Sequence, residues 1–386
     1  MPFVSAIDVF SAELPFRFSF GHALASRRSS ANVYARVRLS DGSVGYGEGV
    51  PRGYVTGETL EGALQALRER YAPALAGREL PDVGAVGEVL AEMADADGEQ
   101  LSPGAFCALE LACLDAAGRS LGRSAADWLG RERDPVVTYD AVLPFLPPAA
   151  LAAVTLAARA AGVRTYKLKA GRGTEADLRA LATVRRIVGS DADVRVDANC
   201  AWTAEEALAA LERMRRYRLS AVEQPVAAGD LEGMALLTAS VPETVVADES
   251  ACGPADVERL VRASACDAVN VRVSKCGGLL RSQRVAEIAR AGGLDLIVGA
   301  QVGESGLLSA AGRHVAASVR PRHVEGSAGA LLLERDLVEE SVLPRRGGRA
   351  RAFSGPGLGV TVREAALTRL GRLRFTVEPS LAAEVS

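Results

Sequence analysis

The stretch T-Y-K-L-K-A, from Thr165 to Ala170, has the pattern of a β-strand with lysines at positions 167 and 169. Side chains two residues apart on a strand point to the same side, so Lys167 and Lys169 share one face of it. Two cations on one face would suit an exposed edge strand. A closed barrel has no edge and a packed inner face, so cations that point inward there need anions beside them. Acidic residues at the ends of the neighbouring strands would supply these anions.

Charged residues recur at the ends of later β-rich runs at a nearly constant interval. Lys169 is followed by Asp197, Glu223, Asp248 and Lys275 at steps of 28, 26, 25 and 27 residues. One strand–helix unit of a (β/α) barrel has about this length, since roughly 250 residues are divided among eight units. The sequence therefore predicts an α/β fold, a modified (β/α)8 TIM barrel of the (β/α)7β type, with eight strands and seven intervening helices. The predicted strands are Val137–Val142, Thr165–Ala170, Val194–Ala198, Ala221–Gln224, Val245–Glu249, Ala268–Ser274, Leu294–Gly299 and His323–Glu325.

We assign residues 131–342 to the predicted barrel, and two further parts flank it. Residues 1–130 are expected to form an α+β domain, because alternating apolar residues and the turn Ser40–Ser43 predict a hairpin over 31–49. Helical patterns follow at 57–74, 83–94 and 104–121. Residues 343–386 are rich in glycine, and we expect this segment to pack back on the α+β domain.

Composition excludes several classes of function. The net charge is −3 and no run of Lys and Arg forms the basic stripe of a nucleic-acid binder, so we expect no nucleic-acid partner. The longest apolar stretch, Ala149–Val163, is broken by Thr155 and Arg159, which predicts a packed helix and no membrane partner. No cysteines form a C-x-x-C pair and the first ten residues lack the pattern of a signal peptide, so we expect a reduced, cytoplasmic protein.

Asp197, Glu223 and Asp248 each end a β-rich run, in V-R-V-D, A-V-E and V-V-A-D. One such acid alone would more often cap the following helix. Three at neighbouring ends of parallel strands meet on the face where barrel active sites lie, and they repel one another unless a cation neutralises them. Mg²⁺ binds carboxylate oxygens and leaves positions for water and substrate. Histidine-based metal sites are disfavoured, since ligand spacing is lacking among His22, His314 and His323.

Lysines beside such an ion suggest removal of a proton next to a carboxylate. Lys167 and the metal would stabilise the resulting enediolate, while Lys169 would take the proton. Strands two and six lie on opposite sides of an eight-stranded ring, so Lys275 would serve the other face of the substrate. Return of the proton to the same carbon is racemisation or epimerisation, whereas elimination and cycloisomerisation share the intermediate. A barrel that binds a carboxylate without converting it is an alternative of another class.

The ordered motifs resemble the enolase superfamily, and within it the muconate-lactonising enzyme subgroup. The likeness covers nearly the whole chain and comprises G-Y-G-E-G, C-A-L-E-L-A-C-L-D-A-A-G-R, K-L-K, D-A-N, E-Q-P, D-E-S and S-K-C-G-G in this order. This superfamily pairs a Lys or His base with Mg²⁺. The resemblance implies that residues 1–130 are a capping domain, that Mg²⁺ is the cofactor with Mn²⁺ as a substitute, and that the chain forms a homo-oligomer. It implies Mg²⁺ ligation by Asp197, Glu223 and Asp248, and catalysis by Lys167, Lys169 and Lys275.

The resemblance also bears on the substrate, which we expect to be a small-molecule carboxylate. The loop Y-V-T-G-E-T is similar to that of dipeptide epimerases, and makes Arg52 and Tyr54 expected substrate contacts. Those epimerases carry D-x-D at the eighth strand end to bind a substrate ammonium, whereas this chain has V-E-G-S-A-G, in which Glu325 lies within one or two residues of that place. Muconate-type cycloisomerases also have a Glu near this point. Asn199 and Glu249 are expected to support the metal ligands.

We therefore expect an isomerase, a racemase or epimerase of an amino-acid derivative or dipeptide. The alternatives are a muconate-type cycloisomerase and a β-eliminating lyase similar to o-succinylbenzoate synthase.

Overall fold

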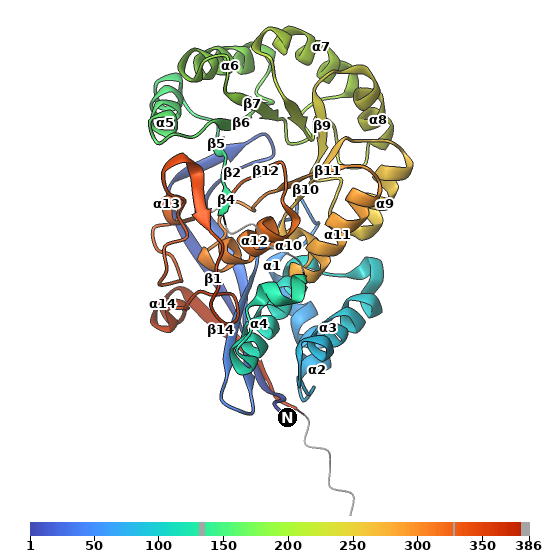
Figure 1. The fold of residues 1–386 in the computed structure, drawn as a ribbon, viewed down its shortest axis with the longest axis vertical. Coiled ribbons are helices and arrows are strands. Elements are labelled where there is room, and N and C mark those ends of the chain that lie inside the picture. The colour runs from blue at the N-terminus through green and yellow to red at the C-terminus, as the bar shows by residue number, and fades with distance from the viewer. Residues whose placement is uncertain (131–135, 327–328, 380–386) are drawn as a thin grey trace, which may run out of the picture.

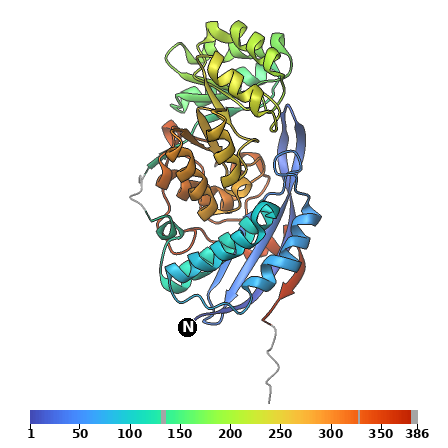
Figure 2. The ribbon, with the colours of Figure 1, turned by 90° about the vertical axis from the view of Figure 1, so that its right-hand side faces the viewer.

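The computed structural model describes residues 1–130, 136–326 and 329–379 of the chain. Figure 1 shows two bodies, a ring of strands covered by helices and, below it, an elongated antiparallel sheet backed by helices. Figure 2 shows the same two bodies after a quarter turn, with the tip of the long sheet reaching up to the ring.

The lower body is built on a four-stranded antiparallel sheet in the order β14-β1-β2-β3. β2 and β3 pair across residues 40–43, which confirms the predicted hairpin. β14 comes from the C-terminal segment and lies antiparallel to β1, where Ile7 faces Val377. The strands are β1 (Val4–His22), β2 (Ala25–Leu39), β3 (Val44–Gly49) and β14 (Gly371–Val377).

Helices cover one side of this sheet. The predicted helix over 57–74 is interrupted by a π-helical turn, which corrects the expectation. Pro73 lacks a backbone N–H and its ring crowds the turn before it, and a π turn accommodates that disturbance. The helical segments are α1 (Leu60–Ala66), the π turn η1 (Leu67–Tyr71), α2 (Ala72–Leu75), α3 (Val83–Asp97), the 3₁₀ turn η2 (Gly98–Gln100), α4 (Pro103–Leu121) and the 3₁₀ turn η3 (Ala125–Leu129).

Helix α4 packs directly on the backbone of β3, and the glycines of G-Y-G-E-G make this possible. A Cβ added to Gly45, Gly47 or Gly49 would lie only 2.0, 2.0 or 1.8 Å from a backbone atom of α4. Residues 45, 47 and 49 share one face of the strand. The alternating glycines therefore form a flat strip on which the helix rests without intervening side chains.

The upper body is an eight-stranded parallel sheet in the order β12-β11-β10-β9-β8-β7-β6-β5. The N–H of Asp140 donates to the carbonyl of Val324 over 2.8 Å, which joins the first strand region to the last. The strands are β5 (Ala141–Leu143), β6 (Thr165–Lys169), β7 (Asp193–Asp197), β8 (Ala221–Glu223), β9 (Thr244–Ala247), β10 (Ala268–Val271), β11 (Asp295–Val298) and β12 (His323–Val324). The modified (β/α) barrel predicted from the sequence is thus confirmed.

A helix follows each of the first seven barrel strands. These helices are α5 (Pro148–Ala160), α6 (Thr174–Val188), α7 (Ala204–Met214), α8 (Leu231–Ser240), α9 (Pro254–Arg262), α11 (Leu279–Ala291) and α12 (Gly306–Val319). Shorter elements are η4 (Arg215–Tyr217), α10 (Val273–Cys276), α13 (Gly329–Leu332), η5 (Arg346–Gly348) and α14 (Glu364–Leu370).

The run predicted as the first barrel strand, Val137–Val142, divides between two sheets. β4 (Val136–Thr138) pairs antiparallel with β13 (Arg349–Arg351), and only β5 belongs to the barrel. The chain passes from one sheet to the other between two adjacent residues. The N–H of Tyr139 donates to the carbonyl of Gly348, and the N–H of Asp140 donates to the carbonyl of Val324.

Two buried carboxylates of the lower body hold the starts of two barrel helices. Glu48, at the end of β3, accepts hydrogen bonds from the N–H groups of Ser305 and Leu308 at the start of α12. Glu110, in the middle of α4, accepts from the N–H groups of Leu279 and Leu280 at the start of α11. Unpaired N–H groups and the helix dipole favour negative charge at both places. The two bodies are therefore joined by specific polar contacts as well as by apolar packing.

The domain boundaries at residues 130 and 342 stay predictions. Within the described ranges, none of the helices has both the length and the apolar character needed to cross a membrane.

Candidate active site

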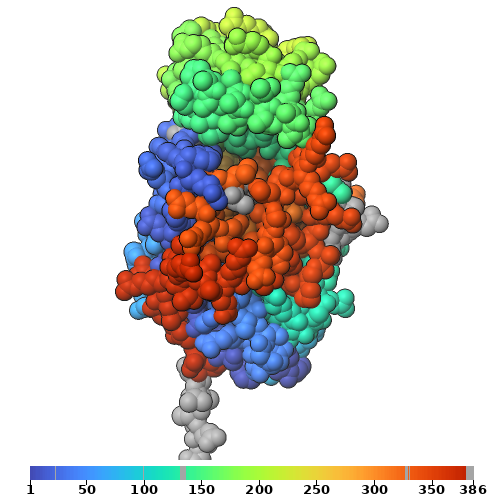
Figure 3. Space-filling view, turned by 90° about the vertical axis from the view of Figure 1, so that its left-hand side faces the viewer, coloured from blue at the N-terminus to red at the C-terminus, as the bar shows by residue number. Residues whose placement is uncertain are grey.

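A cavity of about 440 Å³ lies at the carboxyl ends of the barrel strands, beneath the tip of the β1–β2 hairpin. Figure 3 shows this tip, in blue, against the C-terminal segments in orange, below the green barrel helices. One side of the cavity is polar and includes Lys167, Lys169, Asn199, Glu249, Arg272, Gln301, Glu304 and Glu325. The other is apolar and includes Phe18, Phe20, Tyr54, Val142, Leu146, Val154, Leu331 and Leu332.

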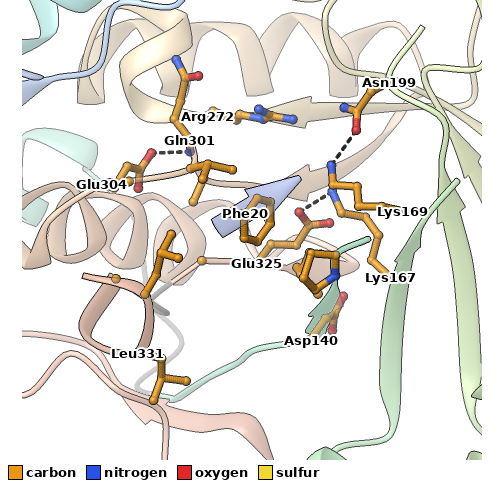
Figure 4. A pocket seen from close by; sticks show the side chains of 18 of the residues that line it. Phe20, Asp140, Lys167, Lys169, Asn199, Arg272, Gln301, Glu304, Glu325 and Leu331 are labelled. Carbon is orange, nitrogen blue, oxygen red and sulfur yellow. Dashed lines mark hydrogen bonds and ion pairs between the residues drawn. The ribbon is translucent and has the colours of Figure 1, made fainter. Parts of the chain in front are cut away.

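Both lysines of β6 point into the barrel, as the alternation predicts. The Nζ of Lys167 lies 3.0 Å from Glu223, 3.1 Å from Asp197 and 2.5 Å from Glu325. Burial lowers the pKa of Lys167, but the three carboxylates outweigh it and raise that pKa above its usual value. Lys167 is therefore a fixed positive charge. Figure 4 shows it beside Lys169 on one side of the cavity.

Lys169 is the more accessible of the pair, although only 7% exposed. Its Nζ donates to Asp197 Oδ2 over 2.5 Å and to Asn199 Oδ1 over 2.9 Å. Asn199 in turn donates from Nδ2 to Glu249 over 3.0 Å. Two acceptors therefore fix the position of the Lys169 amine at the cavity wall, and the predicted supporting residues Asn199 and Glu249 form a chain behind it.

Asp197, Glu223 and Asp248 are brought together at neighbouring strand ends. Asp197 is in register with Lys169 on β6 and with Glu223 on β8, and all three carboxylates are 0% exposed. Burial raises the pKa of Asp197, but Lys169 and Lys167 outweigh it and lower that pKa. Burial raises the pKa of Glu223; Lys167 opposes this, and the charges of Asp197 and Glu325 add to it. These carboxyl groups thus place several negative charges close together at the carboxyl ends of the barrel strands, below the cavity.

The donor set fits a hard divalent ion in type and position. Three buried carboxylates share one end of the barrel, and Glu249 Oε2 is a buried oxygen with no hydrogen-bond partner among the described residues. Across residues 1–130, 136–326 and 329–379, however, no three His, Cys, Asp or Glu side chains are gathered as metal ligands. Instead Asp197 and Glu223 pair with lysines, and Asp248 pairs with Lys275 and Arg272. A bound ion would share these oxygens with the cations that neutralise them here.

Glu325 lines the cavity, but its two oxygens are already occupied. Oε1 lies 2.5 Å from Arg195 Nη2 and Oε2 lies 2.5 Å from Lys167 Nζ. Burial raises the pKa of Glu325, yet Lys167 and Arg195 outweigh it and lower that pKa. Arg195 also pairs with Asp140 over 2.6 Å. Glu325 therefore belongs to a buried ionic network at the barrel seam.

The two residues predicted on the capping loop lie in different surroundings. Tyr54 lines the cavity, with the Arg27 guanidinium 5.4 Å from its ring centre. Arg52 is 2% exposed, is not among the residues that line the cavity, and donates to Ser30 Oγ and to the carbonyl of Val302. Arg52 thus ties the loop to the barrel from behind the cavity wall, and its expected contact with the substrate stays a prediction.

Lys275 does not face the cavity. The barrel strand β10 ends at Val271, and Lys275 lies in the short helix α10, fully buried. Its Nζ donates to Asp248 Oδ1 and to the carbonyls of Asp248 and Asn270, over 2.7–2.8 Å. Burial lowers the pKa of Lys275, with the Cys276 and Cys252 thiols opposing. This geometry gives Lys275 the role of bracing Asp248 and does not support its predicted role as the second acid–base group.

Sequence reasoning missed several residues that line the cavity or lie behind its wall. Arg272 lines it at the end of β10, and Arg195 lies on the inner face of β7 beside Asp197. Strand alternation carried a usable signal, because Arg195 and Asp197 are two residues apart, as are Asn270 and Arg272. Phe18 and Phe20, on the tip of β1, carried no chemical signature that would have identified them.

Comparison with known families gives two matches that together span most of the chain. The family described as enolase C-terminal domain-like matches residues 150–366. The mandelate racemase / muconate lactonizing enzyme N-terminal domain matches residues 6–130.

Individual relatives include enzymes of different specificity. A hydrophobic dipeptide epimerase of Enterococcus faecalis is 30% identical over 315 residues, covering 82% of this chain and 87% of the relative. Muconate cycloisomerase 1-1 of Acinetobacter lwoffii is 30% identical over 376 residues, covering 96% of each chain. The crystal structure of an N-succinyl Arg/Lys racemase from Bacillus cereus superposes with a TM-score of 0.89 at 28% identity, covering 97% of this chain and 100% of that one.

Proposed function

The chain belongs to the enolase superfamily as an isomerase of the mandelate racemase / muconate lactonizing enzyme family, and we propose that it removes the proton next to the carboxylate of a small-molecule substrate. The observation that carries this proposal is the Lys169 amine, held at the cavity wall by Asp197 and Asn199. A base must reach the proton that it takes, and among the three lysines only Lys167 and Lys169 line the cavity.

Each group on the polar side has a distinct task in the proposed reaction. Lys169 takes the proton on its side of the substrate. Lys167 stays protonated among three carboxylates, and its fixed charge faces the oxygen atoms on which negative charge develops. Asn199 and Glu249 keep the Lys169 amine in position.

We assign Asp197, Glu223 and Asp248 as the residues that would hold Mg²⁺, with Mn²⁺ as a substitute. A bound ion would supply positive charge beside the substrate carboxylate. We also propose that the protein is cytoplasmic and forms a homo-oligomer.

The first candidate reaction is racemisation or epimerisation of an amino-acid derivative. The epimerase and racemase among the relatives support it, and so does the apolar side of the cavity, whose Phe18, Phe20 and Leu331 suit a large apolar substituent. The second candidate is cycloisomerisation or β-elimination. The burial of Lys275 favours it, because these reactions need a lysine on one face of the substrate only.

Exchange of the α-proton with deuterium tests the shared first step. The wild-type protein with Mg²⁺ in D₂O should exchange the α-proton of at least one carboxylate in a panel of N-acyl amino acids, dipeptides and muconolactone. Lys169→Met should lower that exchange by roughly 10²–10⁴-fold. Arg186→Ala, on the exposed face of α6, is the matched control and should leave exchange unchanged. Wild-type exchange rates in Lys169→Met would refute the proposal.

A further inference from the structure

We infer that Arg272, not a lysine, faces the substrate from the side opposite Lys169, and that proton transfer in this enzyme is therefore confined to one face. The inference rests on the proposed function, since it concerns the same substrate carbon. It goes beyond that function because it identifies the residue that decides between the two candidate reactions.

The position of Arg272 follows from the order of the barrel strands. Lys169 ends β6, the second barrel strand, and Arg272 directly follows β10, the sixth. In a ring of eight strands the second and the sixth stand opposite each other. Both side chains line the same cavity, and Figure 4 shows the Arg272 guanidinium pointing toward the side where Asn199 and Lys169 lie.

The contacts of Arg272 leave one donor unsatisfied. Its Nη2 pairs with Asp248 Oδ2 and lies 3.9 Å from Glu223 Oε1. Its Nε is buried and has no hydrogen-bond partner in the described part of the chain, although the side chain is only 8% exposed. The guanidinium also lines the cavity and carries a fixed positive charge, so this part of the cavity is suited to a negatively charged or electronegative group of the substrate.

Lys275 cannot take this place without breaking its own contacts. Its three N–H donors match the three acceptors around it, the Asp248 side chain and the carbonyls of Asp248 and Asn270. To reach the cavity, the Lys275 amine would have to break its hydrogen bonds to both buried carbonyls and to the Asp248 carboxylate. Arg272 occupies the intervening position, three residues earlier in the chain and nearer the strand end.

An arginine on the second face changes the chemistry that is available. A guanidinium stays protonated in proteins, so it can stabilise charge but cannot accept a proton from carbon. When the C–H bond breaks, its electron pair remains with the substrate as the enediolate and the proton goes to Lys169 Nζ. The proton can return only from Lys169, to the face it left, so the configuration at that carbon is retained. Net conversion then requires a bond change elsewhere in the substrate: ring closure or ring opening gives an isomer, and departure of a β-leaving group gives an elimination product.

The stereochemistry of exchange tests the inference on the wild-type protein. With Mg²⁺ in D₂O, ¹H NMR should show α-proton exchange for one enantiomer of an N-acyl amino acid, at least roughly 10²-fold faster than for the other, and no inversion. Arg272→Lys should add a base on the second face. It should raise exchange of the other enantiomer by roughly 10²-fold or more and produce racemisation. Arg272→Met should remove the charge without adding exchange of that enantiomer.

A control variant and two distinct outcomes separate the possible failures. Arg284→Lys makes the same change of side chain on the exposed surface of α11, outside the cavity, and should leave the enantiomer preference unchanged. Racemisation by the wild-type protein would overturn the inference and leave the proposed function intact. Absence of exchange with every compound would overturn the proposed function instead.

A substrate-independent measurement tests the geometry itself. The chain has only three lysines, so peptide mapping after reductive methylation with formaldehyde and borohydride reports each of them. Lys169 should be methylated in the folded protein, while Lys275 should stay unmodified until the protein is unfolded. Methylation of Lys275 as fast as that of Lys169 would show that its amine reaches the cavity, and would overturn the inference even without a substrate.

Discussion

The ammonium group of Lys167 lies 2.5 Å from a carboxylate oxygen of Glu325, across the seam that closes the barrel. Arg195 binds the other oxygen, so Glu325 has no oxygen left for a cationic substrate. We predict that α-proton exchange favours N-acetylphenylalanine over alanylphenylalanine, whose free ammonium group would have no anionic partner at this point. Measurement of kcat/KM for exchange of both compounds checks this. A preference for the dipeptide that vanishes in Glu325→Gln would contradict it.

The three carboxylates at neighbouring strand ends should determine the affinity of the protein for Mg²⁺. We expect Asp197→Asn, Glu223→Gln and Asp248→Asn each to weaken Mg²⁺ binding, because each removes a negatively charged oxygen donor. Calorimetric titration of Mg²⁺ into each variant gives the change. Asp295→Asn is a matched control, since Asp295 is exposed at the amino end of β11, away from the cavity. An unchanged Mg²⁺ affinity in all three variants would contradict the assignment of these residues as metal ligands.

The close contact between β3 and α4 should be intolerant of a single added methyl group. Gly47→Ala would bring its Cβ to within 2.0 Å of the Ala108 carbonyl oxygen, so the helix must shift. Overpacking of this kind costs about 1–3 kcal/mol in the free energy of unfolding. Urea denaturation monitored by circular dichroism measures it. Gly229→Ala, with no atom within 4 Å of the added Cβ, should be near neutral and serves as the control.

Glu110 should make stability depend on pH. Burial raises its pKa to about 8, with the N–H groups of Leu279 and Leu280 opposing. A carboxyl group whose pKa is higher in the folded state binds more protons there, so its contribution to stability declines as pH rises from about 4.5 to 8. Thermal unfolding across this range should show a decline that is reduced in Glu110→Gln. An equal decline in both proteins would contradict the assignment to Glu110.

Much of the barrel, and the acidic residues at the carboxyl ends of its strands, could be predicted because charged residues recur at these strand ends at a nearly constant interval. Alternation placed Lys167 with Lys169, and the barrel period placed Asp197 beside Glu223, because both rules depend only on backbone geometry. The choice between Arg272 and Lys275 depends on where β10 ends. The strand stops at Val271 and a helical turn begins at Val273, which turns Lys275 away, and no residue type in V-N-V-R-V-S-K marks that point.

Long-range contacts explain the other differences between the features expected from the sequence and those in the structure. Arg52 is buried because Val302, far along the chain, supplies an acceptor for it. The first predicted barrel strand divides because Gly348 and Val324 compete for adjacent N–H groups, and neither partner is visible in a local sequence window.

The contacts of Glu48 and Glu110 with the starts of α12 and α11 have a consequence for recombination between relatives. Each acid lies in one half of the chain, and the helix whose N–H groups donate to it lies in the other, so a crossover between the halves separates matched partners. A chimera that keeps the acid but receives a helix starting one residue later would bury a carboxyl group without its hydrogen-bond donors. The part that selects the substrate and the part that performs the chemistry should therefore be exchanged only together, or with both acids and both helix starts redesigned as a set.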